Sequence, residues 1–113
     1  MSHEQALARA RARLDPLALY PRPIRSDVRV VVLPLFFRLP KLRRYTGYAL
    51  VRTILLEHAD ASDDLVTHEL VHIWQFQHRP VHMLWTYMTT RYENNPYERE
   101  ARWAVAVTRP RAS

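Results

Sequence analysis

Residues 68–72 have the pattern HExxH, which combines the residue types and the spacing of a metal site. On a helix, His68 and His72 would lie about 40° apart on one face, so both imidazoles could bind a single ion. Glu69 would project beside them, close enough to act as a general base on a water held at that ion. Two histidine ligands, a neighbouring carboxylate and an open coordination position predict a catalytic zinc site.

A site of this kind needs a third protein ligand, and Glu98 is the first candidate. It follows His72 by 26 residues, at the start of another expected helix. The same residue also suits a purely structural role, because it is the third residue of a helix that Asn95 would cap. The residue pattern therefore leaves the role of Glu98 open between metal ligand and helix cap.

Three further histidines compete with Glu98 for the third position. His78 completes the spacing HExxHxxxxxH, but Gln75 stands where that motif has the glycine that lets the chain leave the helix. His78 is therefore expected to stay on the helix and to face away from the other two histidines. Only nearness to the motif recommends His58 and His82.

The elements that must position these residues form a small α+β domain with helices around a short sheet of two or three strands. We interpret residues 1–113 as a single domain. It divides into an N-terminal helix and proline-rich connector (1–26), strands (27–58), the HExxH helix (60–78) and two C-terminal helices (81–108). The separate elements are expected as helices over 2–14, 60–77, 81–92 and 95–107, and as strands over 28–33 and 48–57.

Capping residues mark the two helices that carry the candidate ligands. Asp60 or Ser62 can cap the HExxH helix, and the acidic residues that follow suit the positive end of the helix dipole. Asn95 followed by Pro96 marks the start of the last helix. Strand 48–57 has mixed polarity, which predicts the edge of the sheet.

Apolar residues at helical spacing predict which side of each helix faces the core. In the HExxH helix these are Val66, Leu70 and Ile73. The helix over 81–92 has a longer stripe, which we expect to pack in the core: Val81, Leu84, Trp85, Met88 and Tyr92.

Composition restricts the classes of function. The chain has no cysteine, so a metal must bind through His, Asp or Glu. Its net charge of +6 comes from scattered arginines rather than a basic stripe, so a nucleic-acid partner is not expected. The sequence has neither a signal peptide nor an apolar run of membrane-spanning length, which favours a cytoplasmic protein.

Two stretches resemble a known family. Residues 67–75 (THELVHIWQ) and 92–101 (YENNPYEREA) are similar to small bacterial proteins of the gluzincin class, in which a Glu on a later helix completes the HExxH site. The resemblance covers roughly residues 48–107. It implies a zincin-like fold, Zn2+ as cofactor, His68, His72 and Glu98 as metal ligands, and Glu69 as the catalytic base.

The chain departs from the gluzincin pattern at two places. Arg102 occupies the position where gluzincins often have an Asp that orients a zinc-bound histidine, and Glu100 would lie too far round the helix to replace it. No His or Tyr follows Glu98, so the oxyanion would have to be stabilised elsewhere. Tyr48, Tyr92, Tyr97 or an arginine are candidates for that role.

The resemblance implies a zinc-dependent metallopeptidase in which Glu69 activates a zinc-bound water to hydrolyse a peptide or protein substrate. An extended substrate could add to the sheet edge along residues 48–56. The alternative is a zinc-binding domain with little or no turnover that binds a peptide or protein partner.

Overall fold

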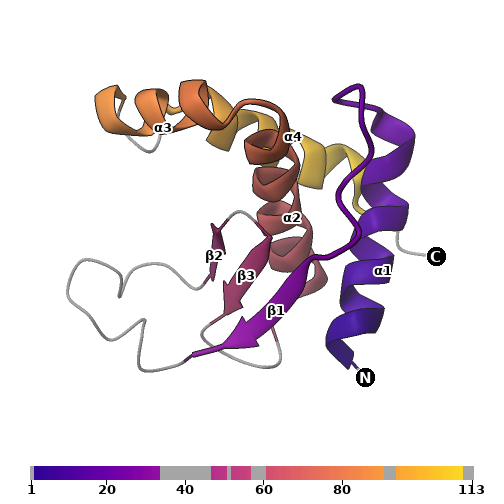
Figure 1. The fold of residues 1–113 in the computed structure, drawn as a ribbon. Helices are drawn as coiled ribbons and strands as arrows, with labels where there is room; N and C mark the ends of the chain where they lie inside the picture. The colour runs from indigo at the N-terminus through magenta and orange to yellow at the C-terminus, as the bar shows by residue number, and fades with distance from the viewer. Residues whose placement is uncertain (1, 34–46, 51, 57–60, 91–93, 111–113) are drawn as a thin grey trace.

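The computed structural model describes residues 2–33, 47–50, 52–56, 61–90 and 94–110, with the backbone alone for 2–3 and 47–50. Within these ranges the elements are α1 (Ser2–Leu14), η1 (Asp15–Leu17, a 3-10 turn), β1 (Arg29–Val32), β2 (Gly47–Leu50), β3 (Thr53–Leu56), α2 (Asp63–His78), α3 (Pro80–Thr89) and α4 (Pro96–Thr108) (Figure 1). The predicted α+β class is confirmed, and the helix bounds agree with the prediction to within a few residues.

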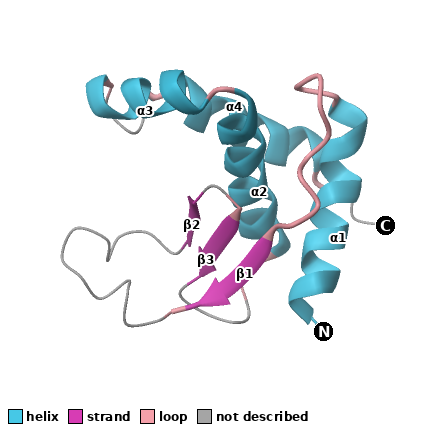
Figure 2. Cartoon of the chain, in the orientation of Figure 1, coloured by secondary structure: helices cyan, strands magenta, loops and turns pink. Residues whose placement is uncertain are grey.

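The three strands form one mixed sheet in the order β1-β3-β2 (Figure 2). β1 pairs with β3 in parallel, and β2 pairs with β3 antiparallel. The prediction of one strand over 48–57 is wrong, because the chain turns at Arg52 and folds this segment into a hairpin. The predicted edge position holds for β2 but not for β3, which is the central strand and buries Ile54, Leu55 and Leu56.

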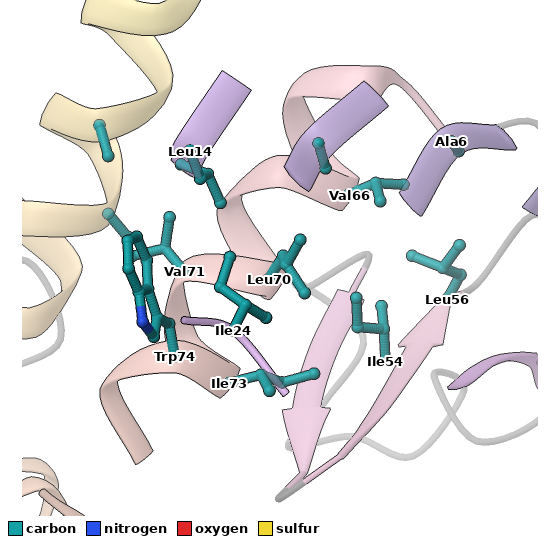
Figure 3. Close-up of a cluster of buried hydrophobic side chains, with 13 residues drawn as sticks. Ala6, Leu14, Ile24, Ile54, Leu56, Val66, Leu70, Val71, Ile73 and Trp74 are labelled. Carbon is teal, nitrogen blue, oxygen red and sulfur yellow. The ribbon is translucent and has the colours of Figure 1, made fainter. Parts of the chain in front are cut away.

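α2 lies at the centre of the domain, where α1 and α4 pack against it on one side and strands β2 and β3 on another (Figure 1). Val66, Leu70 and Ile73 are buried, as the sequence predicts. Val71 and Trp74 are buried as well, so α2 is covered on more sides than its amphipathic pattern indicates. Figure 3 shows the resulting core, to which α1 contributes Ala6, Ala10 and Leu14, the sheet Ile54 and Leu56, and α4 Ala101 and Ala104.

The caps of α2 and α4 set the register of the candidate ligands. Ser62 is the N-cap of α2, and its side chain accepts a hydrogen bond of 3.1 Å from the backbone N–H of Leu65. Asn95 caps α4 in the same way, accepting a 2.8 Å hydrogen bond from the N–H of Tyr97. Both predicted starts are therefore confirmed, whereas the alternative cap Asp60 lies outside the described residues.

The apolar stripe of α3 does not pack in the core, so that prediction is wrong. The exposed fractions are 79% for Val81, 56% for Leu84, 64% for Trp85 and 80% for Met88. α3 instead turns its opposite side, with Met83 and Thr86, toward the domain. Tyr92 lies outside the described residues. Among the helices that the structure describes, none combines the length and the apolar character needed to span a membrane.

Asp64, in the first turn of α2, joins three helices. Its carboxylate accepts hydrogen bonds from Arg13 of α1 at 3.0 Å and from Arg109, the C-cap of α4, at 2.8 Å. Burial favours a higher pKa for Asp64, but the bonds from Arg109 and Arg13 outweigh it and hold this pKa below its usual value of 3.8. Because the folded-state pKa is depressed, this carboxylate stabilises the fold above pH 3.8 and loses that effect as the pH falls.

The substitution Asp64→Asn is therefore expected to lower the free energy of unfolding near neutral pH by about 1 kcal/mol. The effect stays this small because the Asp64 side chain is 38% exposed and solvent screens its charge. Urea denaturation of both proteins over a pH series, with chelator present, measures the difference. It should shrink as the pH falls through the pKa of Asp64, and a difference that is constant with pH would contradict this assignment.

Candidate metal centre

The helical register of α2 places His68 and His72 side by side. They lie one turn apart, with ring centroids separated by 4.8 Å. Their Nε2 atoms are 3.1 Å apart, and His72 is buried while His68 is partly exposed. The shared face expected from the HExxH spacing is therefore present, and both imidazole nitrogens reach the same point beside the helix.

The first turn of α4 brings Glu98 to this point. Its Oε1 lies 3.1 Å from His68 Nε2, and its Oε2 lies 2.8 Å from His72 Nε2. Glu98 is only 3% exposed. The candidate ligand atoms of the three residues all lie within 4.8 Å of one another. Ligands about 2.0–2.2 Å from a tetrahedral zinc stand roughly 3.3 Å apart. His68, His72 and Glu98, called the trio below, therefore need little movement to hold such an ion.

The competing histidines lie elsewhere. His78 accepts a 3.1 Å hydrogen bond at Nε2 from the backbone N–H of Arg22, so its ring faces the N-terminal connector, away from the trio as predicted. His82 places its Nδ1 against the hydroxyl of Tyr97, at 2.5 Å. His58 lies outside the described residues. Among the described candidates, Glu98 is the one that the fold brings to His68 and His72.

Gln75 fixes the tautomer of His72. Its side-chain amide donates to the backbone carbonyl of Tyr97 and to the Glu100 carboxylate, each at 3.0 Å. Both N–H groups are then used, so the amide oxygen is the atom that faces His72 Nδ1, 2.7 Å away. An oxygen at that position requires a proton on Nδ1. Neutral His72 is thereby left with a lone pair on Nε2, directed toward Glu98.

This tautomer makes the trio a place for a cation. The Nε2 lone pair of His72 and the Glu98 carboxylate are both acceptors, and they face each other at 2.8 Å. Burial opposes the charged form of His72, but its hydrogen bond and charge interaction with Glu98 outweigh this and raise its pKa. Burial likewise opposes the charge on Glu98, whose pKa is nevertheless held low by His68 and His72. A proton can bind between these two acceptors. A metal ion held by two neutral imidazoles and a carboxylate can take its place.

Glu69 is buried next to the trio but is not part of it. It is 6% exposed, and no hydrogen bond joins its carboxylate to another of the described residues. Burial raises the pKa of Glu69, against the influence of His72 and His68, which lower it. A carboxylate that is desolvated in this way accepts a proton more readily than one in water.

Tyr87 is a residue of the site that the sequence did not single out. Its hydroxyl donates a 2.6 Å hydrogen bond to Oε2 of Glu98, and its ring lies 6.3 Å from that of His72. α3 thus supplies a side chain that fixes the Glu98 carboxylate. Of the tyrosines considered for the oxyanion, Tyr97 is buried against His82, while the side chains of Tyr48 and Tyr92 lie outside the described residues.

Arg102 cannot orient a histidine ligand as an Asp at its position would. His72 is instead oriented by a series of hydrogen bonds through Gln75 and Glu100. Arg102 is exposed, one turn after Glu98 on α4. Glu100 does not reach His72, as predicted, but it accepts from Gln75, which does. Tyr20, in the N-terminal connector, donates to the same Glu100 oxygen at 2.5 Å. The orientation of His72 therefore depends on contacts that extend to the N-terminal part of the chain.

Replacing Gln75 tests this support directly. Gln75→Leu removes the acceptor that holds His72 Nδ1, and loss of such a partner lowers metal affinity by about 10–100-fold. Competition with a chromophoric chelator measures the zinc affinity, and circular dichroism checks that the variant is folded.

Gln77→Leu is the matched control, because Gln77 lies on the same helix and bonds to Arg25 and Pro23 instead. It should leave the zinc affinity unchanged. Equal losses in both variants would show that Gln75 acts only through the stability of the helix.

Comparisons with known protein families, curated proteins and solved structures find no match to this chain.

Proposed function

We propose that this protein is a zinc-dependent metallopeptidase in which His68, His72 and Glu98 hold the zinc ion and Glu69 is the general base. The observation that carries the proposal is the meeting of a His72 lone pair, the second imidazole and the Glu98 carboxylate at one point, with Glu69 buried next to it. Two imidazoles and one carboxylate match a donor set common in catalytic zinc sites, and three protein ligands leave a position open.

A zinc ion bound here would lower the pKa of a water molecule in the open position and polarise the carbonyl of the scissile peptide. Glu69 would be the general base of the reaction. Its carboxylate takes a proton from the attacking water and passes it to the leaving amine. The burial that raises the pKa of Glu69 supports this role, because the group must hold the proton between the two transfers.

The organisation around the site supports a zincin-like reading of the fold. α2, which carries the HExxH motif, packs along β2 and β3. β2 is an edge strand, and no described residue pairs with its outer side. We propose that an extended peptide adds to this edge, which in the structure is Gly47–Leu50 rather than the whole segment 48–56 suggested by the sequence. Backbone hydrogen bonds would then hold the substrate beside the metal centre.

The experiment that tests this function is a cleavage assay on an unfolded protein substrate. Zinc-loaded wild type, chelated wild type and Glu69→Gln are compared by mass spectrometry of the products. Cleavage is expected from the first sample, and far slower cleavage or none from the other two. If zinc-loaded wild type binds the substrate without cleaving it, the protein is a zinc-dependent peptide-binding domain and the peptidase proposal fails.

A further inference from the structure

The outward side of α3 is an apolar surface of four side chains, formed by Val81, Leu84, Trp85 and Met88. Their spacing of three, four and seven residues places them on one side of the helix, opposite the side that faces the domain. Figure 1 shows α3 at one end of the molecule, beyond the C-terminal end of α2. Four large apolar residues exposed on one short helix are typical of an interaction surface rather than of scattered surface residues.

The exposed charged side chains that the structure describes next to this helix are basic, whereas the Glu98 carboxylate that contacts it is buried. Arg79 is the exposed N-cap of α3, and Arg22 donates to the carbonyl of Gln77 close by, at the end of α2. Arg99, exposed on α4, follows the glutamate that contacts α3. Among the described residues, the exposed carboxylates lie on other elements, and they are Glu4, Asp15, Asp27 and Asp63. The α3 end of the described chain therefore combines an apolar stripe with positive charge.

We propose that α3 docks on the surface of an anionic lipid bilayer. Large apolar residues on one side of a helix enter the boundary between headgroups and acyl chains, and a tryptophan such as Trp85 favours that boundary. Arginines near such a helix, here Arg79 at its N-terminal end, attract anionic headgroups. The apolar stripe and Arg79 both belong to the α3 region, in a protein whose net charge is +6.

A second copy of the chain fits this surface less well. α3 has ten residues and is about 15 Å long, so its stripe offers less than the roughly 800 Å² per partner that a stable protein interface needs. A symmetric pair would also bring Arg79 and Arg22 of both copies together, and like charges at an interface are unfavourable. A bilayer requires no matching partner surface and supplies the opposite charge.

Docking through α3 would bring the candidate metal centre close to the membrane. The side of α3 that faces the domain carries Tyr87, which donates to Glu98. Membrane binding does not depend on the proposed metal chemistry, because the four docking residues face away from the trio. A variant of the stripe should therefore lose membrane binding while it keeps its zinc, which separates this inference from the proposed peptidase function.

The test is co-sedimentation of the full chain with phosphatidylcholine vesicles that contain or lack phosphatidylglycerol. Wild type is expected to bind the anionic vesicles. Leu84→Glu should weaken that binding at least roughly tenfold, because it places a charge where an apolar side chain enters the bilayer. The matched control is Leu33→Glu, the same substitution at another exposed leucine (42% exposed, against 56% for Leu84) that follows β1. It should bind like wild type.

Three results would overturn the proposal. Wild type could fail to bind anionic vesicles. Leu84→Glu could bind as tightly as wild type, which would leave net charge as the only cause of binding. Analytical ultracentrifugation could show a wild-type dimer that Leu84→Glu dissociates, without vesicle binding, in which case the stripe is an interface between copies of the chain.

Discussion

Glu69→Gln is expected to reduce kcat/KM for peptide hydrolysis by roughly a hundred- to ten-thousand-fold, the usual contribution of a general base. Glutamine has the size of glutamate but cannot take a proton from water. Zinc binding should persist, because Glu69 lies outside the group of atoms that converge at the candidate metal position. Steady-state kinetics on a peptide substrate, with elemental analysis of the same samples, measures both quantities.

The control for this substitution is Glu4→Gln, which removes the same charge from an exposed position on α1. It should cleave at the wild-type rate. A Glu69→Gln variant that cleaves as fast as wild type would show that another group activates the water. Loss of zinc along with loss of cleavage would show that Glu69 helps to hold the metal.

Glu98→Ala is expected to lower zinc affinity by more than about 100-fold. Loss of a residue that merely orients a ligand costs about 10–100-fold, and loss of a ligand should cost more. Two histidines would remain on α2, without the carboxylate that meets both Nε2 atoms. Competition with a chromophoric chelator measures the affinity, and circular dichroism shows whether the variant still folds.

His78→Ala is the control for the Glu98→Ala measurement, because His78 is the alternative third ligand that the sequence offers. In the structure its ring stacks on Tyr20, with centroids 5.1 Å apart, and contacts the connector. The substitution should leave zinc affinity unchanged. If His78→Ala releases zinc while Glu98→Ala retains it, the site is built differently from the geometry described here.

Local signals predicted the elements that carry the candidate site. The HExxH spacing, the Ser62 cap and the Asn95 cap each act over a few residues, so they fix where α2 and α4 begin and which way the ligands face. The pairing of Glu98 with the two histidines came from a family resemblance, and the structure brings the same three residues together.

Features that depend on distant packing could not be predicted in this way. The helical spacing of the α3 stripe is the same whether a helix faces the core or the solvent, and here the opposite side of α3 meets the domain. The hairpin of β2 and β3 depends on pairing across the turn at Arg52. The chain of contacts from Tyr20 through Glu100 and Gln75 to His72 joins segments that only the folded chain brings together.

The most direct test of the proposed metal centre is the zinc content of the wild-type chain, purified without chelator and measured by elemental analysis. A site made by His68, His72 and Glu98 predicts close to one zinc per chain, removed by chelator and restored by added zinc. A wild-type protein that is folded yet holds no zinc, and takes up none when zinc is supplied, would contradict the proposed centre and the chemistry derived from it.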